Sequence, residues 1–411
     1  MLNLVKVKSK KIDDYQSLIS KKLFFQIKRL SQGLNGLKVF HINSTPKGGG
    51  VAEVLKSLVP LMKGVGLDAR WYSIPYDKKF FQLTKRLHNT LQGKEFSFSG
   101  SAQEEYQKHL KRIAGSLKDI ESAIWVIHDP QPVGLVDYLD LSTSLISRIH
   151  IDTTNSNPEA WQFISHFLRK YDKIIFSSRG FVRSKIPGSK TVIFPPAIDP
   201  LTVKNKALSL KEAKNVLKGF GFNFNKPLIS QVSRFDRWKD PLGVIEAFRL
   251  ARQEIPGLQL VLVGFFQAQD DPEAEEVYRA VKNEIEREKD IYLFADLKEL
   301  KGLNIDIFVN AVQVISDVVL QKSIREGFGL TVAEAMWKGK LVIGGNVGGI
   351  KLQIDNGRNG FLVSSPEQAA DRIVKLIGSP ALAKKIGERG RNDVRNNFLT
   401  PRLLKDYLKL F

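Results

Sequence analysis

Short apolar runs alternate with longer segments of helical spacing along most of the chain. The first half contains LKVFHI, AIWVIH, SLISRIHI, KIIFSS and TVIFPP, mostly separated by helical or loop lengths. Runs that stay apolar at every position predict strands buried on both faces, as in a parallel sheet. The first run leads through a glycine loop into VAEVLKSLVPLMKGVG, whose apolar positions predict a helix.

The same cycle starts again after FPPAIDPL, residues 194–201. The runs PLISQVSRF, LQLVLVG, DIYLFA, IDIFVNA and LVIGG follow, and each predicts a strand, including IDIFVNA at residues 305–311. Pro195, Pro196 and Pro200 restrict the backbone between the two cycles and are typical of a linker or hinge. The pattern therefore predicts an α/β protein with two layered domains.

The predicted division of the chain has four parts. An amphipathic segment, YQSLISKKLFFQIKRL, indicates a helical extension, and TPRLLKDYLKLF has helical spacing after its proline. The parts are an N-terminal extension at 1–35, a first domain at 36–200, a second domain at 201–395, and a C-terminal helix at 396–411 that could cross back to the first domain.

Composition narrows the class of protein. A chain of 411 residues, 43% hydrophobic and 26% charged, falls in the range of soluble globular proteins. MLNLVKVKSK lacks the apolar run of a secretory signal, and no segment reaches the length of a membrane span, so we expect a cytoplasmic protein. The absence of cysteine excludes thiol chemistry and, with the many lysines, fits a thermophilic source.

The net charge of +20 indicates an anionic partner. Nucleic acid is one alternative, but the lysines are spread along the whole chain and no basic run is interleaved with aromatic residues. This distribution argues against nucleic acid. A solvated, lysine-rich surface explains most of the charge and would still attract an anionic substrate.

The stretch REGFGLTVAEAMWKGK carries two carboxylates, Glu326 and Glu334. Its glycines disfavour helix at the start, whereas the remainder has helical spacing, so we expect Glu326 in a loop and Glu334 in an early helical turn, with Thr331 as the cap. Unpaired amides at such a helix start attract phosphate, and carboxylates accept hydrogen bonds from hydroxyls. The helix dipole alone also explains an acid here, so the stretch leaves a cap and a sugar-nucleotide site open.

A second stretch, QVSRFDRWKDPLGVIEAF, places Arg234 and Lys239 directly after a predicted strand. Two cations on one loop could clamp a diphosphate and stabilise its charge as it leaves. The spacing alone favours the alternative that both are solvated surface charges.

Three further loops follow predicted strands, where open parallel sheets bind ligands. Gly48, Gly49 and Gly50 allow close approach of a ligand to the backbone, or form a structural turn. The pairs His150 with Asp152, and His128 with Asp129, end two other strands. A single histidine is more often a packed structural residue, and this alternative stays open for both.

Together these features resemble the retaining GT-B glycosyltransferases, over nearly the whole chain beyond about residue 35. Within that class, FHINSTPKGGGVAEVLKSLVPLMKGVGLDARWY, RIHID, PPAIDPL, VSRFDRWKDP, QKSIREGFGLTVAEAMWKGK and VGGIKLQI are similar to the trehalose glycosyltransferring synthases of archaea and thermophilic bacteria. The resemblance implies two Rossmann-like domains that face each other across a cleft and close about the linker.

The resemblance also implies an activity. Glucose would pass from a nucleoside diphosphate glucose, ADP- or UDP-glucose, to free glucose, giving trehalose with retention of configuration and in a reaction that could be reversible. A trehalose phosphorylase, another GT-B transferase, and a nucleic-acid-binding α/β protein remain alternatives.

The resemblance assigns a role to each candidate residue, at its position in this sequence. The nucleotide and diphosphate of the donor would be held from the second domain, and the acceptor from the first. Arg234 and Lys239 would bind the diphosphate, Glu334 the ribose, and Glu326, Gly327, Phe328, Gly329, Leu330 and His150 the donor sugar, with Gly49 and Gly50 beneath the reacting groups and Asp129 and Asp152 on the acceptor. We interpret Glu326 as a positioning group and not as a nucleophile. The resemblance implies departure and attack on the same face of the sugar, and the sequence does not settle this mechanism.

The expected partners are nucleoside diphosphate glucose and glucose or trehalose, with no nucleic acid and no membrane; a homodimer is left open. No metal site is predicted because an Asp-x-Asp pair is absent. No cofactor is required by the motifs, although Mg²⁺ could assist the diphosphate. Lysines outside the motifs, such as Lys204 and Lys214, are expected to affect turnover only through weak steering.

Overall fold

The computed structural model describes residues 2–95, 97–98, 100–117, 120–140, 142–265 and 274–411. Contacts divide the chain into two compact units. The N-terminal unit contains the described residues up to Ala197 together with Thr400–Phe411, and the C-terminal unit contains those from Ile198 to Leu399. Each unit has its own sheet, and each is described by itself.

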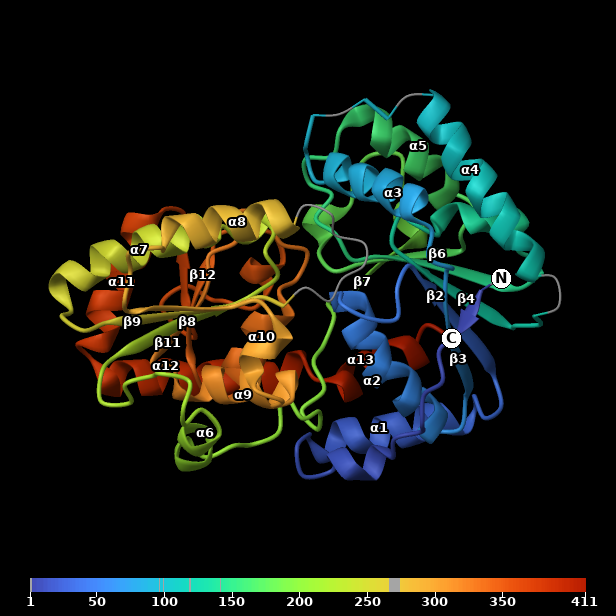
Figure 1. Cartoon of the computed structure of the whole chain (residues 1–411). Coiled ribbons are helices and arrows are strands. Elements are labelled where there is room, and N and C mark those ends of the chain that lie inside the picture. Colours follow the sequence, from blue (N-terminus) through green and yellow to red (C-terminus); the bar gives the residue numbers. More distant parts are fainter. Residues whose placement is uncertain (1, 96, 99, 118–119, 141, 266–273) are drawn as a thin grey trace. The chain divides into compact units, whose positions relative to one another are not determined.

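The N-terminal unit contains one twisted sheet of seven strands (Figure 1). The strands, in their order across the sheet, are β1 (Asn3–Leu4), β3 (Asp68–Ser73), β2 (Lys38–Asn43), β4 (Ile124–His128), β5 (Ser144–Ile149), β6 (Lys173–Phe176) and β7 (Thr191–Ile193). Only β1 runs antiparallel to its neighbour, and the other pairs are parallel. The strand order reverses direction at β2, which lies between β3 and β4.

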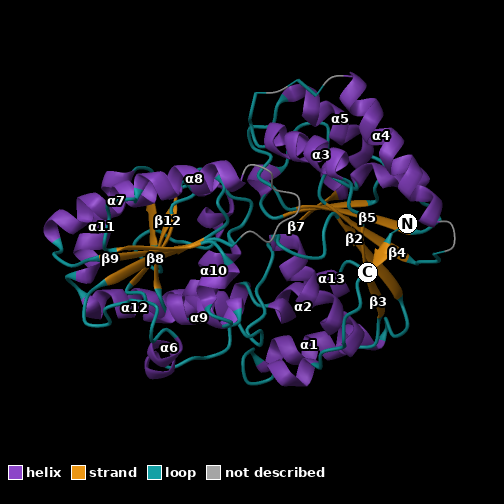
Figure 2. Cartoon of the chain, viewed as in Figure 1, coloured by secondary structure: helices purple, strands orange, loops and turns teal. Residues whose placement is uncertain are grey.

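Helices cover both faces of this sheet (Figures 1 and 2). One face carries α3 (Lys78–Leu91), α4 (Gly100–Ala114) and α5 (Pro158–Leu168), and the other carries α1 (Lys21–Gln32), α2 (Gly50–Gly64) and α13 (Thr400–Leu408). The core under α3, α4 and α5 includes Phe40, Trp125 and Ile127. Side chains alternate across a strand, so His41 and Val126 point toward the face that carries α2 and α13.

The C-terminal unit has a sheet of six parallel strands. In order across the sheet they are β10 (Ile291–Phe294), β9 (Gln259–Val263), β8 (Leu228–Val232), β11 (Val318–Gln321), β12 (Leu341–Gly345) and β13 (Phe361–Val363). Numbered from β8, this order reads 3-2-1-4-5-6, which is the doubly wound order of Rossmann folds. The switch point, where ligands bind in such sheets, lies between β8 and β11 at their carboxyl ends.

Seven helices of the described chain belong to the C-terminal unit: α6 (Leu210–Val216), α7 (Pro241–Glu254), α8 (Ala274–Glu284), α9 (Ile305–Ile315), α10 (Leu330–Trp337), α11 (Pro366–Ile377) and α12 (Pro380–Asn397). Two hydrophobic cores form on opposite faces of its sheet. One packs α7 and α11 against the strands, and the other packs α6 and α9. The predicted α/β class with two Rossmann-like sheets is confirmed.

The predicted strand at residues 305–311 is wrong, because this segment is the first part of helix α9. Asn304 caps the helix: its side-chain oxygen accepts hydrogen bonds from Asp306 N–H at 2.9 Å and Ile307 N–H at 3.3 Å. The apolar run extends through Ile315, so it has the length of a helix that is buried on most of its surface. The neighbouring strand is the shorter run β11, which the periodicity did not separate from it.

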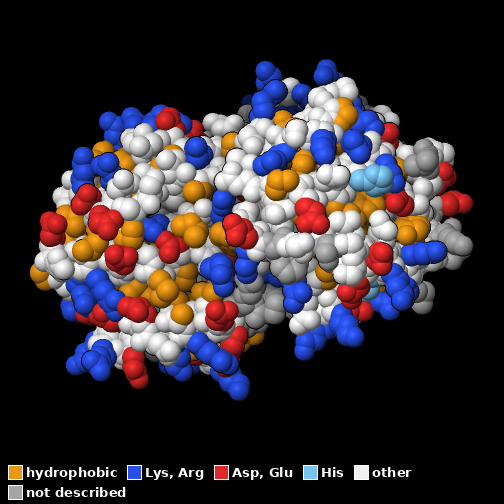
Figure 3. Space-filling view, turned by 90° about the horizontal axis from the view of Figure 1, so that it is seen from above, with side chains coloured by type: hydrophobic (Ala, Val, Ile, Leu, Met, Phe, Trp, Pro, Cys, Tyr) orange, Lys and Arg blue, Asp and Glu red, His pale blue; other side chains and the backbone are white. Residues whose placement is uncertain are grey.

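The described chain contains no helix that is both long and apolar enough to cross a membrane. On the face shown in Figure 3, lysine and arginine side chains are scattered among aspartates and glutamates. The excess of positive charge is therefore not gathered into one patch on that face.

Candidate functional site

The loops after β8 and β11 meet at the switch point of the C-terminal sheet. The Lys239 ammonium forms an ion pair with the Glu326 carboxylate, and both side chains are largely shielded from solvent. Ile324 N–H donates to Trp238 O at 2.9 Å, which joins the same two loops through their backbones. Residues far apart in the sequence thus form one compact group of charges.

A buried amide, Gln231, fixes these loops to the sheet. Its Nε2 donates to Lys239 O at 3.1 Å, and its Oε1 accepts from Lys322 N–H at 3.3 Å. Gln231 lies inside β8 and is only 1% exposed. Gln231 was not among the predicted site residues, although a polar side chain in an otherwise apolar strand is a recognisable signal.

Arg234 lies on the same loop and is more accessible. Its side chain is 36% exposed, and its Nη2 lies 3.5 Å from Asp236 Oδ2. The other Asp236 oxygen, Oδ1, accepts a hydrogen bond from Trp238 N–H at 2.9 Å, as the cap of the short helix Arg237–Lys239. This contact is long for a charge-assisted hydrogen bond.

Helix α10 begins with an unusual backbone. Gly329 has φ of 83°, a conformation that favours glycine, and it provides no side-chain cap. Gln353 Nε2 donates to the carbonyls of Phe328 at 2.5 Å and Gly329 at 3.1 Å. The carbonyls therefore turn toward Gln353, and the first amides of the helix have the character of an anion-binding N-terminus.

The expectation that Thr331 caps this helix is wrong. Thr331 Oγ1 donates instead to Gln321 Oε1 at 2.8 Å, at the end of β11. Thr331 lies inside the helix, because the chain turns into it through the positive φ of Gly329. The Phe328 side chain is buried and packs on Phe398 with ring centroids 5.5 Å apart.

Close backbone packing accounts for Gly349 in the glycine-rich loop after β12. Its N–H donates to Glu326 O at 2.9 Å, and an added Cβ would lie 2.3 Å from Gly327 O and from Phe328 Cα. Only glycine lets these two backbones pack so closely. The loop after β12 therefore supports the loop that carries Glu326.

Glu334 lies in the second turn of α10 and is only 4% exposed. Lys204 Nζ lies 3.6 Å from Glu334 Oε1. Burial lowers the pKa of the neighbouring Lys338 to about 8, with the Glu334 charge opposing this shift and the Lys204 charge adding to it. Lys204 is thus the charge partner of a candidate residue, and the size of its effect on turnover stays a prediction.

The N-terminal unit contains a row of hydrogen-bonded histidines at the carboxyl ends of its central strands. His41 Nδ1 lies 2.9 Å from His128 Nε2, and His128 Nδ1 lies 2.9 Å from His150 Nε2. Burial, as the largest cause, lowers the pKa of His41 to about 3 and those of His128 and His150 well below the usual value, with the positive charge of Arg148 acting in the same direction. All three imidazoles are therefore neutral near pH 7.

Asp129 is tied to this row through the backbone. It adopts φ of 66°, its N–H donates to Arg148 O at 2.8 Å, and its Oδ1 accepts from His150 N–H at 2.7 Å. Burial raises the pKa of Asp129 to about 7, although the hydrogen bond from His150 and the charge of Arg148 oppose the shift. A carboxyl group of this kind can donate or accept a hydrogen bond near neutral pH.

Arg148 is a buried cation beneath the same strand ends, with 1% exposure. Its Nη1 donates to Tyr407 Oη at 3.0 Å, and its guanidinium lies 4.9 Å from the centre of the Phe194 ring and 5.5 Å from that of Tyr407. Tyr407 belongs to α13, so the last helix supplies a partner for a residue in the central sheet. No sequence signal at residue 148 indicated this contact.

Local structure accounts for Asp152 but not for Gly49, the other candidate of the N-terminal unit. Gly49 has φ of −131° and precedes α2, whose first residue is Gly50. An added Cβ at Gly49 would meet nothing within 4 Å, so the local structure does not require glycine there. Asp152 is explained locally, because its Oδ1 accepts from Thr154 N–H at 2.9 Å in a turn.

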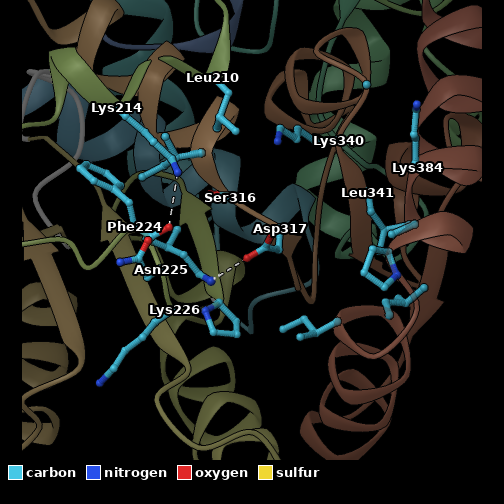
Figure 4. Close-up of a pocket in the computed structure, with 18 of the residues that line it drawn as sticks. Leu210, Lys214, Phe224, Asn225, Lys226, Ser316, Asp317, Lys340, Leu341 and Lys384 are labelled. Carbon is cyan, nitrogen blue, oxygen red and sulfur yellow. Dashed lines mark hydrogen bonds between the residues drawn. The ribbon is translucent and has the colours of Figure 1, made fainter. Parts of the chain in front are cut away.

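A groove of about 550 Å³ lies at the opposite end of the C-terminal sheet (Figure 4). It is lined at the amino ends of β8, β11 and β12 by Leu228, Asp317 and Leu341, and lysines surround it. Asp317 Oδ2 accepts from Leu228 N–H at 2.9 Å. Because ligands of open parallel sheets bind at carboxyl ends, the charged group around Lys239 and Glu326 is the better candidate site.

Within the described residues, no three histidine, aspartate or glutamate side chains are arranged to hold a metal ion. The carboxylates at the switch point are paired with lysines instead.

Two family models match the chain. The model for the N-terminal domain of trehalose synthase matches residues 41–183, and the model for glycosyl transferases group 1 matches residues 214–393. The trehalose synthase of Pyrococcus horikoshii is 40% identical over 402 residues, covering 98% of this chain and 96% of that protein. The trehalose synthase of Rubrobacter xylanophilus is 40% identical over 416 residues, covering 100% and 99%.

Solved structures show the same fold at lower identity. The α,α-trehalose-phosphate synthase (UDP-forming) of Burkholderia xenovorans has a TM-score of 0.71 at 12% identity, covering 91% of this chain and 99% of that one. The sucrose-phosphate synthase of Thermosynechococcus elongatus has a TM-score of 0.70 at 16% identity, covering 91% and 98%.

These findings define the class of the protein as the GT-B glycosyltransferases, in agreement with two doubly wound sheets and a charged group at the switch point. The identity to curated relatives over nearly their whole length is more specific. The chain belongs to the trehalose synthase family.

Proposed function

We propose that this protein makes trehalose by transferring glucose from a nucleoside diphosphate glucose to free glucose, with retention at the anomeric carbon. The observation that carries this proposal is 40% identity to proteins named trehalose synthase over 96% and 99% of their length. The charged loops at the switch point of the C-terminal sheet support it, because a nucleotide sugar presents both anionic phosphates and hydroxyl groups.

The C-terminal unit has the groups that a nucleotide-sugar donor needs. Arg234, Lys239 and the first amides of α10 would bind the diphosphate, and the Glu334 carboxylate would accept hydrogen bonds from the ribose. Glu326 already holds Lys239, so its carboxylate can fix that ammonium while accepting from a sugar hydroxyl. These preorganised positive groups would stabilise the negative charge that grows on the leaving diphosphate.

The chemical step follows from retention. The bond between the anomeric carbon and the diphosphate oxygen breaks, and the acceptor hydroxyl oxygen bonds to that carbon on the same face. The hydroxyl proton passes to the departing phosphate oxygen. This route needs no nucleophile from the chain, which agrees with Glu326 being occupied by Lys239.

The N-terminal unit would hold the sugars. His150 would donate or accept a hydrogen bond at the donor glucose, and Asp129 would bind acceptor hydroxyls. The raised pKa of Asp129, about 7, lets this group act in either direction near neutral pH. Gly49 and Gly50 would leave room for the reacting groups, since a side chain at Gly49 would enter open space. Asp152 is the weaker acceptor candidate, because Thr154 already occupies one of its oxygens.

The test is a panel of donors and acceptors with product identification by NMR. Purified protein with ADP-, UDP- or GDP-glucose and glucose is expected to release nucleoside diphosphate and form α,α-trehalose. Assays with and without EDTA measure whether Mg²⁺ bound to the diphosphate contributes. Another linkage, or no turnover with any of the three donors, would contradict the proposal.

A phosphorylase is the second candidate because the chain is also 26% identical to the trehalose phosphorylase of Pleurotus pulmonarius, covering 54% of that protein. Incubation of trehalose with inorganic phosphate, in parallel with trehalose and nucleoside diphosphate, separates the two. We expect breakdown only with the nucleoside diphosphate.

A further inference from the structure

Three histidines from three strand ends form a continuous hydrogen-bonded row in the N-terminal unit. His41 lies in β2, His128 ends β4, and His150 follows β5. Strand register places His41 beside Val126 and His128 beside Arg148, and the alternation of side chains puts the histidines on the face that carries α2 and α13. The two links, each 2.9 Å between ring nitrogens, are within hydrogen-bond distance.

The row limits where protons can lie. A neutral imidazole has one N–H, so each link needs one ring to donate and the other to accept. His128 takes part in both links and must donate in one and accept in the other. The three rings therefore have only two self-consistent arrangements, which differ in every proton position.

In the first arrangement, His150 donates from Nε2 to His128, His128 donates from Nε2 to His41, and the His41 proton lies on Nε2. In the second, His41 donates from Nδ1 to His128, and His128 donates from Nδ1 to His150. His150 then carries its proton on Nδ1, and His41 Nε2 is a bare nitrogen.

The end of the row at His41 Nε2 favours the second arrangement. His41 Nε2 is buried and has no hydrogen-bond partner among the described residues. A proton there would be a buried N–H without an acceptor, which costs about 1–3 kcal/mol, whereas a bare ring nitrogen is an unpaired acceptor and is more often tolerated.

The charges around the row keep the three rings in the neutral form that both arrangements require. The groups that face it are Arg148 from β5, Asp129 after β4, and Tyr407 from α13, whose ring centroid lies 5.9 Å from that of His41. The buried Arg148 guanidinium is positive and helps to lower the pKa of His41, so it disfavours a second proton on this ring.

We propose that His41 and His128 are positioning residues that lock His150 into its Nδ1–H form, so that His150 offers a neutral hydrogen-bond donor through Nδ1 to an oxygen of the bound sugar. The sugar ligand in this inference rests on the proposed function, whereas the proton arrangement does not. The lock also holds the ring plane of His150, since its Nε2 is used by His128. A fixed donor avoids the free-energy cost of reorienting the ring during the reaction.

The first experiment is performed without substrate. Selective ¹⁵N labelling of histidine gives six residues, whose ring nitrogens report the tautomer directly. At pH 7.5 we expect His150 with a protonated Nδ1 and a bare Nε2, and His41 with a bare Nε2. A His150 protonated at Nε2, or on both nitrogens, would overturn the lock whatever the activity of the protein.

The second experiment removes the end of the row. His41→Phe takes away the Nδ1 donor, so the His150 tautomer is expected to shift toward Nε2–H and kcat/KM to fall by about tenfold, on the scale of one lost hydrogen bond. His41→Asn keeps an N–H near the position of Nδ1 and is expected to retain the wild-type tautomer and activity within about threefold. His166→Asn, at an exposed position outside the row, is the matched control.

If His41→Phe does not fold, the wild-type spectrum and His41→Asn still decide the question. A folded His41→Phe variant with an unchanged His150 tautomer would overturn the role of His41. A shifted tautomer with wild-type kcat/KM would overturn the functional part of the inference. If no substrate is turned over, only the proposed function fails, and the spectra still test the lock.

Discussion

Lys204 Nζ lies 3.6 Å from Glu334 Oε1. A lysine near the start of the C-terminal unit, before α6, therefore pairs with a carboxylate inside helix α10. Asn205 extends this contact: its side-chain oxygen accepts from Lys338 Nζ at 3.1 Å, and its carbonyl accepts from Trp337 Nε1 at 3.1 Å. The segment at residues 204–205 therefore supports the helix that would bind the ribose of a nucleotide.

The Lys204→Met variant should weaken donor binding. Removing the ammonium leaves the buried Glu334 carboxylate without its cation, and we expect the KM for nucleoside diphosphate glucose to rise roughly tenfold, equivalent to about 1.4 kcal/mol. Initial rates at varied donor concentration measure this effect. Lys384→Met is the control, because Lys384 is an exposed lysine that lines the groove at the amino ends of β8, β11 and β12. Equal effects of the two changes would contradict a specific role for Lys204.

Alanine at Arg234 or Lys239 should affect the leaving diphosphate. We expect kcat/KM to fall by about 10²-fold or more for each, the scale of losing a preorganised electrostatic donor. Lys214→Ala removes the same charge from a lysine that lies over the Phe224 ring and is expected to change turnover only slightly. Equal losses in all three folded variants would show that general charge, and not a local clamp, is responsible.

Lys239→Ala should also lower stability, and Arg234→Ala, at a more exposed cation of the same loop, is the comparison. Lys239 is the partner of the shielded Glu326 carboxylate, and its removal leaves that charge uncompensated. We expect a loss of about 1–3 kcal/mol in the free energy of unfolding, and partial recovery in the Lys239→Met, Glu326→Gln double variant. Urea unfolding of the four proteins provides the comparison.

Substitution of Gly49 should affect activity more than stability. At Gly49 the φ of −131° suits alanine and a Cβ meets nothing within 4 Å, so Gly49→Ala should change stability by less than about 1 kcal/mol. Its activity should nevertheless fall about tenfold or more if reacting groups lie against this residue. Full activity would remove Gly49 from the site.

Gly349→Ala should behave in the opposite way. The new Cβ would lie 2.3 Å from Gly327 O and Phe328 Cα, so the loop that carries Glu326 must move. We expect a loss of both activity and about 1–3 kcal/mol of stability, measured by kinetics and thermal unfolding on the same samples. A stable, inactive Gly349→Ala variant would argue against this packing.

The buried histidines predict loss of stability in mild acid. Their pKa values are lowered in the folded state, so the unfolded chain binds more protons as pH falls below 6.5, and stability falls with it. Asp129 acts oppositely, because its raised pKa, about 7, makes the folded state bind the extra proton between that value and 3.8. The three histidines outnumber it, so we expect a net loss of stability between pH 6 and 5.

Urea unfolding at pH 7, 6 and 5 measures this dependence. Replacing His128 by Gln removes one titrating ring and should reduce the slope by about 1.4 kcal/mol per pH unit. A free energy of unfolding that is constant from pH 7 to 5 would show that the row is not buried in the neutral form.

The strands that the sequence predicted well were those bounded by clear breaks. LVIGG ends in two glycines and became β12, and LQLVLVG became β9. IDIFVNA failed because its apolar run continued to Ile315, where length favours a helix over a strand, and β11 followed with only Ser316 and Asp317 between. Periodicity cannot separate two buried elements that meet without a polar break.

The candidate site was predictable where one loop carried several signals. Arg234 and Lys239 follow β8 as expected, and Glu326 lies in a loop. The partners were not predictable: Lys204 reaches Glu334, and Tyr407 reaches Arg148, across long sequence separations. The row of histidines could have been predicted from the alternation of side chains along the strands. His128 and His150 both occur at strand ends, and His41 precedes the first glycine loop.

Helix α13 packs against α1 and α2, and Arg402 donates to the carbonyls of Pro195 at 3.0 Å and Pro196 at 2.7 Å. During synthesis on the ribosome, the sheet of the N-terminal unit is complete in sequence by residue 193, yet Arg148 must wait for Tyr407 to emerge before it gains its hydroxyl partner. The first unit to be translated is therefore among the last to finish folding, and a nascent chain stalled before residue 400 should leave its central sheet open to chaperones and proteases.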